Sequence, residues 1–271
     1  MINVLKGIIT AFALLVPGVS GGTMMIVLNV YDQTIAAMSQ LISGKLIHKK
    51  MMFQLALGGL IGIIFFSSTI QYLITSYPMP MCYLFLGLVL TGIGTFISKI
   101  NWKQFKISYL LYFSVGLIIA VLTTFFNTDQ LINGHVSGIQ YLALVIVSGV
   151  VIAVALILPG ISTSFLLLSL GMYDDTLQAF STFDLRYIVP LIIGILLGLL
   201  LTTKLLEYLL QHHTTPTYLM ILGFVLGSVG TIFPGVPVST QWISSLVMFG
   251  LGVILMIFIQ WLVVKYPSQS D

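Results

Sequence analysis

Long apolar stretches separated by short polar segments dominate the sequence. Apolar runs cover about residues 2–16, 22–38, 53–76, 81–98, 107–126, 140–158, 162–180, 187–210, 217–234 and 242–264. About 20 apolar residues cross the hydrocarbon core of a bilayer as a helix, which satisfies every backbone polar group internally. The pattern therefore predicts an all-α polytopic membrane protein with a single membrane domain over residues 1–271.

The composition excludes an ordinary soluble protein. Of the 271 residues 58% are hydrophobic and 6% are charged, whereas about 25% are charged in a typical soluble domain. The mean hydropathy is +1.13. The formal net charge of +3 serves membrane orientation here, so we expect no nucleic-acid partner. A lone cysteine, Cys82, leaves no basis for a disulfide or a metal site, and we expect no cofactor.

The chain contains two similar halves. Residues 17–39 match residues 159–181 at an offset of 142, and later segments match at an offset of 136. We predict repeat one over residues 1–126 and repeat two over residues 140–265. The matched pairs include polar and proline positions, which chance similarity between apolar helices does not produce: Pro17/Pro159, Gly18/Gly160, Ser20/Ser162, Tyr31/Tyr173, Asp32/Asp174, Gly58/Gly194 and Gly62/Gly198.

Each half is predicted to hold a helical pair broken at its Pro-Gly motif, followed by three full-length helices. The broken pair adds an even number of crossings, whether it re-enters or spans twice. Each half then crosses an odd number of times, and the second half must be inserted upside down. Inverted repeats of this kind are typical of secondary transporters.

The charges predict the orientation of the chain. With the N-terminus inside, all lysines fall in cytoplasmic segments, as the positive-inside rule requires. We therefore expect both termini in the cytoplasm. The opposite face carries Arg186 and four acids. The lysines are Lys6, Lys45, Lys49, Lys50, Lys99, Lys103, Lys106, Lys204 and Lys265, and the acids are Asp129, Asp174, Asp175 and Asp184.

The two Pro-Gly segments are the candidate substrate site. We predict re-entrant hairpins whose tips, residues 16–23 and 158–165, meet near the membrane midplane. Each tip begins a helix, whose free N–H groups and dipole favour an anion. The simpler alternative is that Pro-Gly only marks a loop between two ordinary spans. The candidate binding residues are Pro17, Gly18, Ser20, Gly21, Gly22, Thr23, Pro159, Gly160, Ser162, Thr163 and Ser164.

A few charged residues lie in or beside the apolar segments, and they are candidates for coupling or gating. Asp32 and Asp174 are related by the repeat, although interfacial anchoring beside a tyrosine would also explain them. Lys6 could pair with Asp32. Glu207 has Lys204 one turn away, as in a simple surface ion pair. The full set is Lys6, Asp32, Asp174, Asp175, Arg186 and Glu207.

Residues 18–22 also fit the G-x-S-x-G pattern of serine hydrolases. A catalytic Ser20 would need a base, and all four histidines fall in predicted loops. The second copy lacks the pattern. We therefore expect a protein that is not an enzyme.

The motifs PGVSGGT and YDQT, with the second copies PGIS and YDDT, resemble the PopT-type bacterial polyprenyl-phosphate transporters. The resemblance covers essentially the whole chain. It implies return of undecaprenyl phosphate, the lipid carrier of cell-wall synthesis, from the outer to the inner leaflet of the plasma membrane. A secondary transporter of a small soluble anion is the alternative. The sequence does not determine the oligomeric state, and a homo-oligomer is one of the possibilities.

Inward movement of such a lipid would need charge compensation. A phosphate monoester carries about −1.5 to −2 charges, and each charge costs about 2.3 kcal/mol per 100 mV against an inside-negative potential. Acids within the membrane are natural proton carriers. The sequence therefore suggests proton coupling through Asp32 or Asp174, with a co-transported cation as the alternative.

Overall fold

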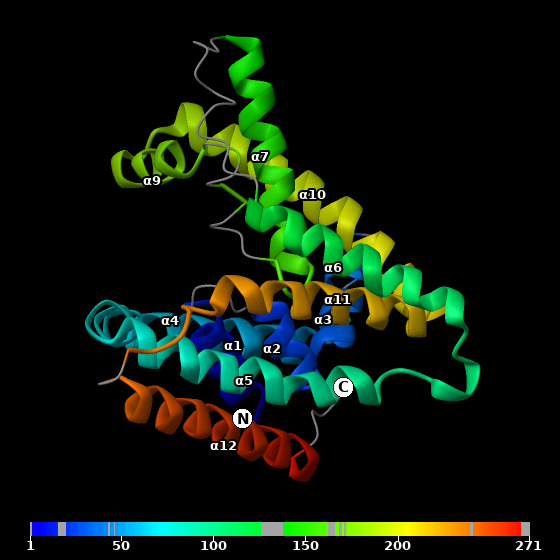
Figure 1. Cartoon of the computed structure of the whole chain (residues 1–271). Coiled ribbons are helices and arrows are strands. Elements are labelled where there is room, and N and C mark those ends of the chain that lie inside the picture. The colour runs from blue at the N-terminus through cyan, green and yellow to red at the C-terminus, as the bar shows by residue number, and fades with distance from the viewer. Residues whose placement is uncertain are drawn as a thin grey trace.

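The computed structural model describes residues 2–15, 20–42, 44–45, 47–125, 138–161, 166–167, 170, 172–238 and 241–266 (Figure 1). Within these residues every regular element is a helix, as predicted. The first half contains α1 (Ile2–Leu14), α2 (Gly21–Val27), α3 (Tyr31–Ile42), α4 (Lys49–Ser76), α5 (Pro78–Ser98), the 3-10 turns η1 (Trp102–Gln104) and η2 (Ile107–Tyr109), and α6 (Leu110–Phe125). The second half contains α7 (Ile139–Ile157), α9 (Tyr173–Thr182), α10 (Leu185–His212), α11 (Thr214–Ile232) and α12 (Trp242–Lys265).

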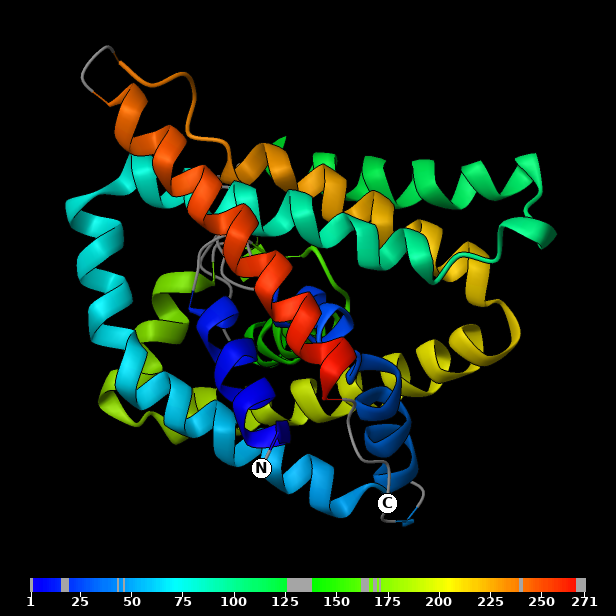
Figure 2. The same ribbon diagram turned by 90° about the horizontal axis from the view of Figure 1, so that it is seen from below.

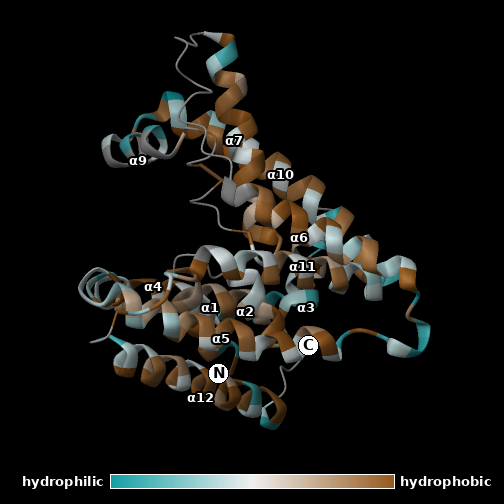
Figure 3. Cartoon of the chain, viewed as in Figure 1, coloured by the Kyte–Doolittle hydropathy of each residue, from teal (hydrophilic) through white to brown (hydrophobic). Residues whose placement is uncertain are grey.

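Five of the described helices, α4, α5, α7, α10 and α12, are long and apolar enough to cross a membrane. The helix α1 and the segments Ile107–Leu122 and Thr214–Gly230 are shorter apolar helices. Large apolar side chains face outward, such as Phe65 at 72% exposed and Ile243 at 80% exposed. Hydrophobic residues make up much of the long helices, with more polar residues between them (Figure 3). A surface of this kind needs lipid rather than water around it, so the chain is a multi-pass membrane protein.

The apolar run over residues 22–38 was predicted to be one helix. In the structure the helix ends after α2, and a new helix, α3, begins at Tyr31. Asn29 has a left-handed φ of 54°, and its N–H bonds to the carbonyl oxygen of Ile26 at 3.0 Å. The N–H of Val30 reaches back to Met25 at 3.0 Å. These two bonds form the Schellman motif, which ends a helix and turns the chain. The predicted continuous helix was therefore wrong at this point.

The same helix end recurs in the second half. Met172, which is equivalent to Val30, donates its N–H to the carbonyl oxygen of Leu167 at 3.0 Å. The following helix begins at Tyr173, as α3 begins at Tyr31. The local sequence therefore ends and restarts the helix at equivalent positions in both halves.

Glycines pack helix pairs together in equivalent ways in the two halves. A Cβ on Gly58 of α4 would collide with the Val4 carbonyl of α1, and one on Gly194 of α10 with the Ile146 carbonyl of α7. These contacts correspond at the offsets of 136 and 142 found in the sequence. Small residues let helix backbones approach closely in membranes. The same correspondence joins Gly62 with Ala11 and Gly198 with Ala153.

The remaining long helices form two further pairs, α5 with α12 and α6 with α11. Gly87 meets the backbone of Phe249, and the equivalent Gly223 meets that of Phe113. In all four helix pairs the numbers of the contacting residues rise together, so the paired helices run parallel. Packing therefore repeats along with sequence, while the repeat boundaries and the inversion across a membrane stay predictions.

The helices α1 and α2 lie among the longer helices. In the view of Figure 2, α4, α5 and α10 lie around α1, and α12 crosses in front. The main core cluster draws on α2, α3, α5 and α11, with fully buried side chains such as Val30, Phe96 and Ile221. The helices α7 and α9 extend away from this body at the top of Figure 1.

Candidate functional site

The described part of the first tip starts at Ser20, since Pro17 and Gly18 lie outside the described residues. Ser20 is the N-cap of α2, with φ −92° and ψ 136°, but its hydroxyl does not cap the helix. The first hydrogen bond of α2 runs from Met24 N to Ser20 O at 3.3 Å. The amides of Gly21, Gly22 and Thr23 therefore precede the intrahelical bonds. With only seven residues in α2, these individual N–H groups matter more than a helix dipole.

The two glycines of this tip are packed against protein. A Cβ on Gly21 would lie 2.6 Å from Cδ2 of Leu14, at the end of α1. Ser20 and Thr23 are also buried, at 7% and 4% exposed. The sequence suggested that glycine here leaves room for a ligand. In this conformation the Leu14 side chain occupies that space.

The second tip turns directly after α7. Gly160 has a left-handed φ of 86°, and a Cβ there would lie 2.7 Å from the carbonyl carbon of Phe224 and from the amide nitrogen of Val225. Both requirements exclude a side chain. Pro159 and Gly160 are buried. The hydroxyl residues predicted to follow them, Ser162, Thr163 and Ser164, lie outside the described residues.

The described parts of the two tips contact each other. A Cβ on Gly22 would lie 3.3 Å from the Ile157 carbonyl oxygen and 3.3 Å from Cγ of Pro159. The Tyr31 hydroxyl donates a buried hydrogen bond of 2.8 Å to the same Ile157 carbonyl. Ile157 ends α7, so its carbonyl has no partner in the next helical turn and gains one here. The N-terminus of α2 is thus held against the second Pro-Gly turn.

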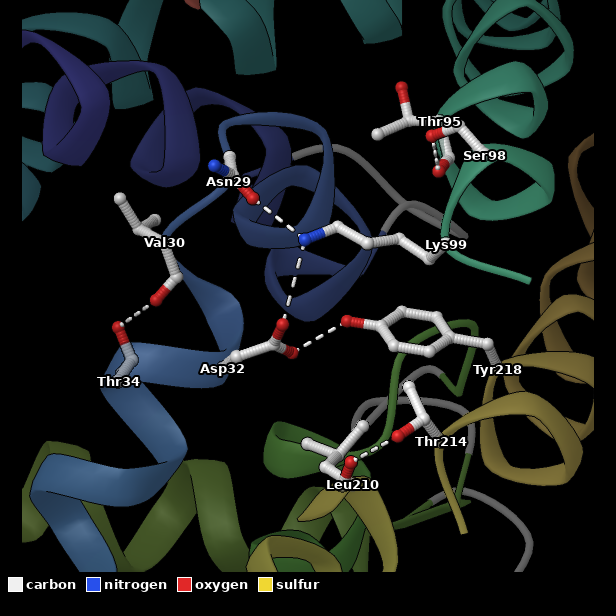
Figure 4. A network of polar contacts seen from close by, with 10 residues as sticks. All are labelled: Asn29, Val30, Asp32, Thr34, Thr95, Ser98, Lys99, Leu210, Thr214 and Tyr218. Atoms are coloured by element: carbon white, nitrogen blue, oxygen red, sulfur yellow. Dashed lines mark hydrogen bonds and ion pairs between the residues drawn. The ribbon is translucent and has the colours of Figure 1, made fainter. Parts of the chain in front are cut away.

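Asp32, at the start of α3, belongs to a polar cluster (Figure 4). One carboxylate oxygen accepts a hydrogen bond of 2.6 Å from the Tyr218 hydroxyl of α11. The other lies 3.6 Å from Nζ of Lys99 at the end of α5. Nζ of Lys99 also donates to Oδ1 of Asn29 at 2.8 Å. The cluster ties the break between α2 and α3 to two helices of the main body.

The expected pair between Lys6 and Asp32 is not formed, because Asp32 has these other partners. Lys6 is 2% exposed, and its Nζ has no hydrogen-bond partner among the described residues. A buried ammonium without a partner is costly. Nζ of Lys6 thus lies buried and unpaired within the described part of the chain.

The other coupling candidates are spread over the molecule. Asp175 accepts a hydrogen bond from the Tyr141 hydroxyl at 3.3 Å. Asp174 lies in α9, and its side chain is outside the described part. Arg186 is exposed in the first turn of α10. The structure does not bring these three to Asp32.

Glu207 joins α10 to α3. Its Oε1 accepts from Nε2 of Gln40 at 3.5 Å and from Nε2 of Gln211 at 3.3 Å. The suggested pair with Lys204 is not among its contacts in the described chain. Glu207 therefore contributes to the contact between α3 and α10.

Three residues of the polar cluster at Asp32, Lys99, Tyr218 and Asn29, were not among the site residues predicted from the sequence. Lys99 counted only as one of the loop lysines, and Tyr218 is a single phenol in an apolar helix. Tyr218 and Asp32 are 186 positions apart, so no spacing pattern could join them. Asn29 carried one readable signal, because asparagine before a new helix is typical of a helix end in the left-handed conformation.

Comparison with known proteins shows the family. Residues 10–249 match the VCA0040-like family, described as undecaprenyl phosphate translocase-like. A polyprenyl-phosphate transporter of Staphylococcus aureus (strain NCTC 8325 / PS 47) is 31% identical over 265 residues, covering 93% of each chain. One from Vibrio cholerae serotype O1 (strain ATCC 39315 / El Tor Inaba N16961) is 31% identical over 244 residues, covering 85% of this chain and 76% of the relative. No solved structure matches. The protein belongs to the VCA0040-like, undecaprenyl phosphate translocase-like family.

Proposed function

We propose that this protein is a transporter that moves polyprenyl phosphate from the outer to the inner leaflet of the bacterial plasma membrane. The observation that carries the proposal is the similarity to two proteins named polyprenyl-phosphate transporters. In the Staphylococcus aureus relative it extends over 93% of both chains. A similarity of this extent covers nearly the whole of both chains and is not confined to one motif.

The phosphate headgroup would bind where the two tips meet. Three features support this site: the free amides at the start of α2, the Ser20 hydroxyl that does not cap its helix, and the contact between Gly22 and the second Pro-Gly turn. Backbone N–H groups at a helix start bind phosphate without a lysine. The isoprenoid tail would stay in the bilayer, against the exposed apolar faces of the outer helices.

Transport fits the described geometry better than hydrolysis at Ser20. His48 is the N-cap of α4, and the parallel packing of α1 and α4 places it near the start of α1. Ser20 follows the other end of α1, about 20 Å away for a helix of this length. His212 and His213 end α10, and His212 stacks on Tyr208. None of these three histidines is hydrogen-bonded to Ser20.

Proton coupling would offset the charge of the headgroup. At 100 mV, inside negative, moving a dianion inward costs about 4–5 kcal/mol. This free energy would shift the distribution of the lipid between the leaflets more than a thousandfold toward the outer one. Asp32 or Asp174, which are related by the predicted repeat, would carry the proton. Asp32 already accepts a hydrogen bond from Tyr218 and lies 3.6 Å from the Lys99 ammonium. Uptake of a proton with the phosphate outside and its release inside would make the cycle favourable.

The test is reconstitution of the purified full chain with labelled undecaprenyl phosphate. Leaflet exchange should exceed that of protein-free vesicles. Ser20→Ala should slow it by about tenfold, because a hydrogen bond to a charged group contributes about 1.5–3 kcal/mol. Ser68→Ala, on the exposed face of α4, is the matched control and should leave the rate of leaflet exchange unchanged. Exchange at the protein-free rate, with accelerated uptake of a small soluble anion, would instead support the alternative substrate class.

A further inference from the structure

A cavity of about 500 Å³ lies where the ends of three helices meet, outside the contact between the tips. The C-terminal end of α2 forms one wall, and the last turns of α5 and α12 form the others. The parallel packing of α5 and α12 explains why their last turns adjoin. The polar lining residues are Asn29, Thr95, Ser98, Lys99 and Gln260.

Lys99 supplies the cavity with a cation that has donors to spare. An ammonium group has three N–H donors. One of them bonds to Asn29 at 2.8 Å. The distance of 3.6 Å to Asp32 exceeds the 2.7–2.9 Å typical of a charge-assisted hydrogen bond. Because Tyr218 holds the other oxygen of Asp32 at 2.6 Å, Lys99 can turn to a ligand while the carboxylate keeps a partner.

The rest of the lining is apolar. Val27, Val263 and Val264 face the same cavity as Lys99, and Val264 is 84% exposed. Nearby in α12, Nζ of Lys265 lies 4.7 Å from the centre of the Trp261 ring, one helical turn earlier. Aromatic and basic residues of this kind are typical of a membrane interface. The cavity thus offers a positive charge beside a surface suited to a hydrocarbon chain.

Two more lysines follow Lys99 in the sequence. Lys103 and Lys106 follow Lys99 on the next segment, and Asn101 of that segment bonds to Thr215 at the start of α11. Asp32 is the acid in contact with Lys99. Neither Lys103 nor Lys106 lines the cavity, so an anion that enters it competes with the Asp32 carboxylate for Lys99.

We propose that this cavity is a second phosphate site, which binds the phosphate monoester headgroup of a lipid with Lys99 as counter-ion. The start of the tail lies against Val27, Val263 and Val264. Identification of the lipid as polyprenyl phosphate rests on the proposed function. In the transport cycle this is the station at the lysine-rich end, where the headgroup rests after it leaves the tips.

Cysteine protection tests the site directly. Ser98→Cys, in a Cys82→Ala background, places a near-isosteric thiol on the cavity wall of the full-length protein in nanodiscs. Undecaprenyl phosphate at about ten times its Kd should slow alkylation about tenfold, because occupancy follows mass action. Ser108→Cys is the matched control, since Ser108 is also exposed and lies beyond the cavity. Its alkylation rate should not change.

The charge is tested with lysine variants in the Ser98→Cys background. Lys99→Gln should weaken binding about tenfold, so that the same lipid concentration protects only about twofold. Lys99→Arg should keep the protection and Lys103→Gln should leave it unchanged, which separates loss of the charge from misfolding. Full protection of the Lys99→Gln variant would overturn the proposal.

Comparison of different ligands tests which part of the lipid the site recognises. Undecaprenol, which lacks the phosphate, should not protect, and protection equal to that of the phosphate lipid would overturn anion recognition. Protection by inorganic phosphate with none by the lipid would overturn the lipid assignment. The same purified protein is reconstituted in vesicles and assayed for leaflet exchange. Exchange without protection overturns this site alone, whereas protection without exchange overturns the proposed transport alone.

Discussion

At the scale of single residues, Gly160 shows how the second tip is fixed to the main body. Its backbone is left-handed, with φ 86°, and its Cα lies against the α11 backbone at Phe224 and Val225. The first requirement is conformational and the second is steric. The positive φ and the close α11 backbone both apply at Gly160, in the turn whose Pro159 contacts Gly22. A side chain at this position would therefore displace the second tip.

We predict that Gly160→Ala destabilises the protein more than Gly235→Ala. Gly235 has a similar φ of 93°, but nothing lies within 4 Å of a Cβ built there. Each alanine should cost about 1–2 kcal/mol for the left-handed backbone. Only Gly160→Ala adds a collision with backbone. Thermal unfolding in detergent measures the difference, and equal losses would show that α11 does not pack against the tip.

At the scale of elements, the helices are joined as four parallel pairs with glycines at the contacts. Lipid is as apolar as the helix faces, so burial alone does not select partners, and close packing of small residues does. Gly58 and Gly194 occupy equivalent places in the pairs α1/α4 and α7/α10. Each pair holds the first arm of a hairpin against a long helix, which fixes the tip at the end of that arm.

We expect Gly58→Ala and Gly194→Ala to destabilise the protein to a similar degree. In each case the new methyl group meets a backbone carbonyl, that of Val4 or Ile146. Gly59→Ala is the control on the same helix, since a Cβ there has nothing within 4 Å. It should be neutral or slightly stabilising, because alanine is the better helix former. Thermal melts of the three variants check this, and a neutral Gly58→Ala would contradict the packing.

At the scale of the whole molecule, polar segments far apart in sequence gather at one end. Asn101 bonds to Thr215 at 3.2 Å, and Lys99 lines a cavity with Val264 near the C-terminus. These belong to three of the segments for which the lysine distribution predicts a cytoplasmic location. Their proximity is what a common membrane face requires.

The predicted orientation can be measured by cysteine labelling. In a Cys82-free background, cysteines at Lys49 and Lys103 should react only with a reagent on the cytoplasmic side. A cysteine at Asp129 should react only from outside, because an odd number of crossings separates it from the N-terminus. Labelling of position 129 from the cytoplasm would exclude the inverted-repeat topology.

Proton coupling makes a prediction for the transport cycle as a whole. Asp174→Asn should flatten the pH dependence of leaflet exchange, and an inward proton gradient should accelerate the wild type but not this variant. Asp184→Asn is the control, because Asp184 caps α10 by accepting from Arg186 N at 3.0 Å and asparagine caps equally well. Wild-type exchange that ignores both the gradient and a protonophore would rule out coupling to protons.

The sequence by itself determined the helices, the membrane environment and the matched positions of the two halves. These depend on the length of the apolar runs and on small residues that recur at constant offsets, whereas the helix end at Asn29 was found only in the structure. The apolar runs and the recurring small residues can be recognised from the residue types along the chain, without knowing which helices contact each other.

Only the tertiary structure decided which polar groups meet. Asp32 is held by Tyr218 and Lys99 rather than by Lys6, and Gly21 packs on Leu14 rather than facing open space. The cavity at Lys99 likewise needs the ends of three helices. Such contacts depend on the rotation and depth of each helix against its neighbours. In a chain whose helices are apolar on nearly every side, hydrophobicity does not specify these quantities, and close packing does.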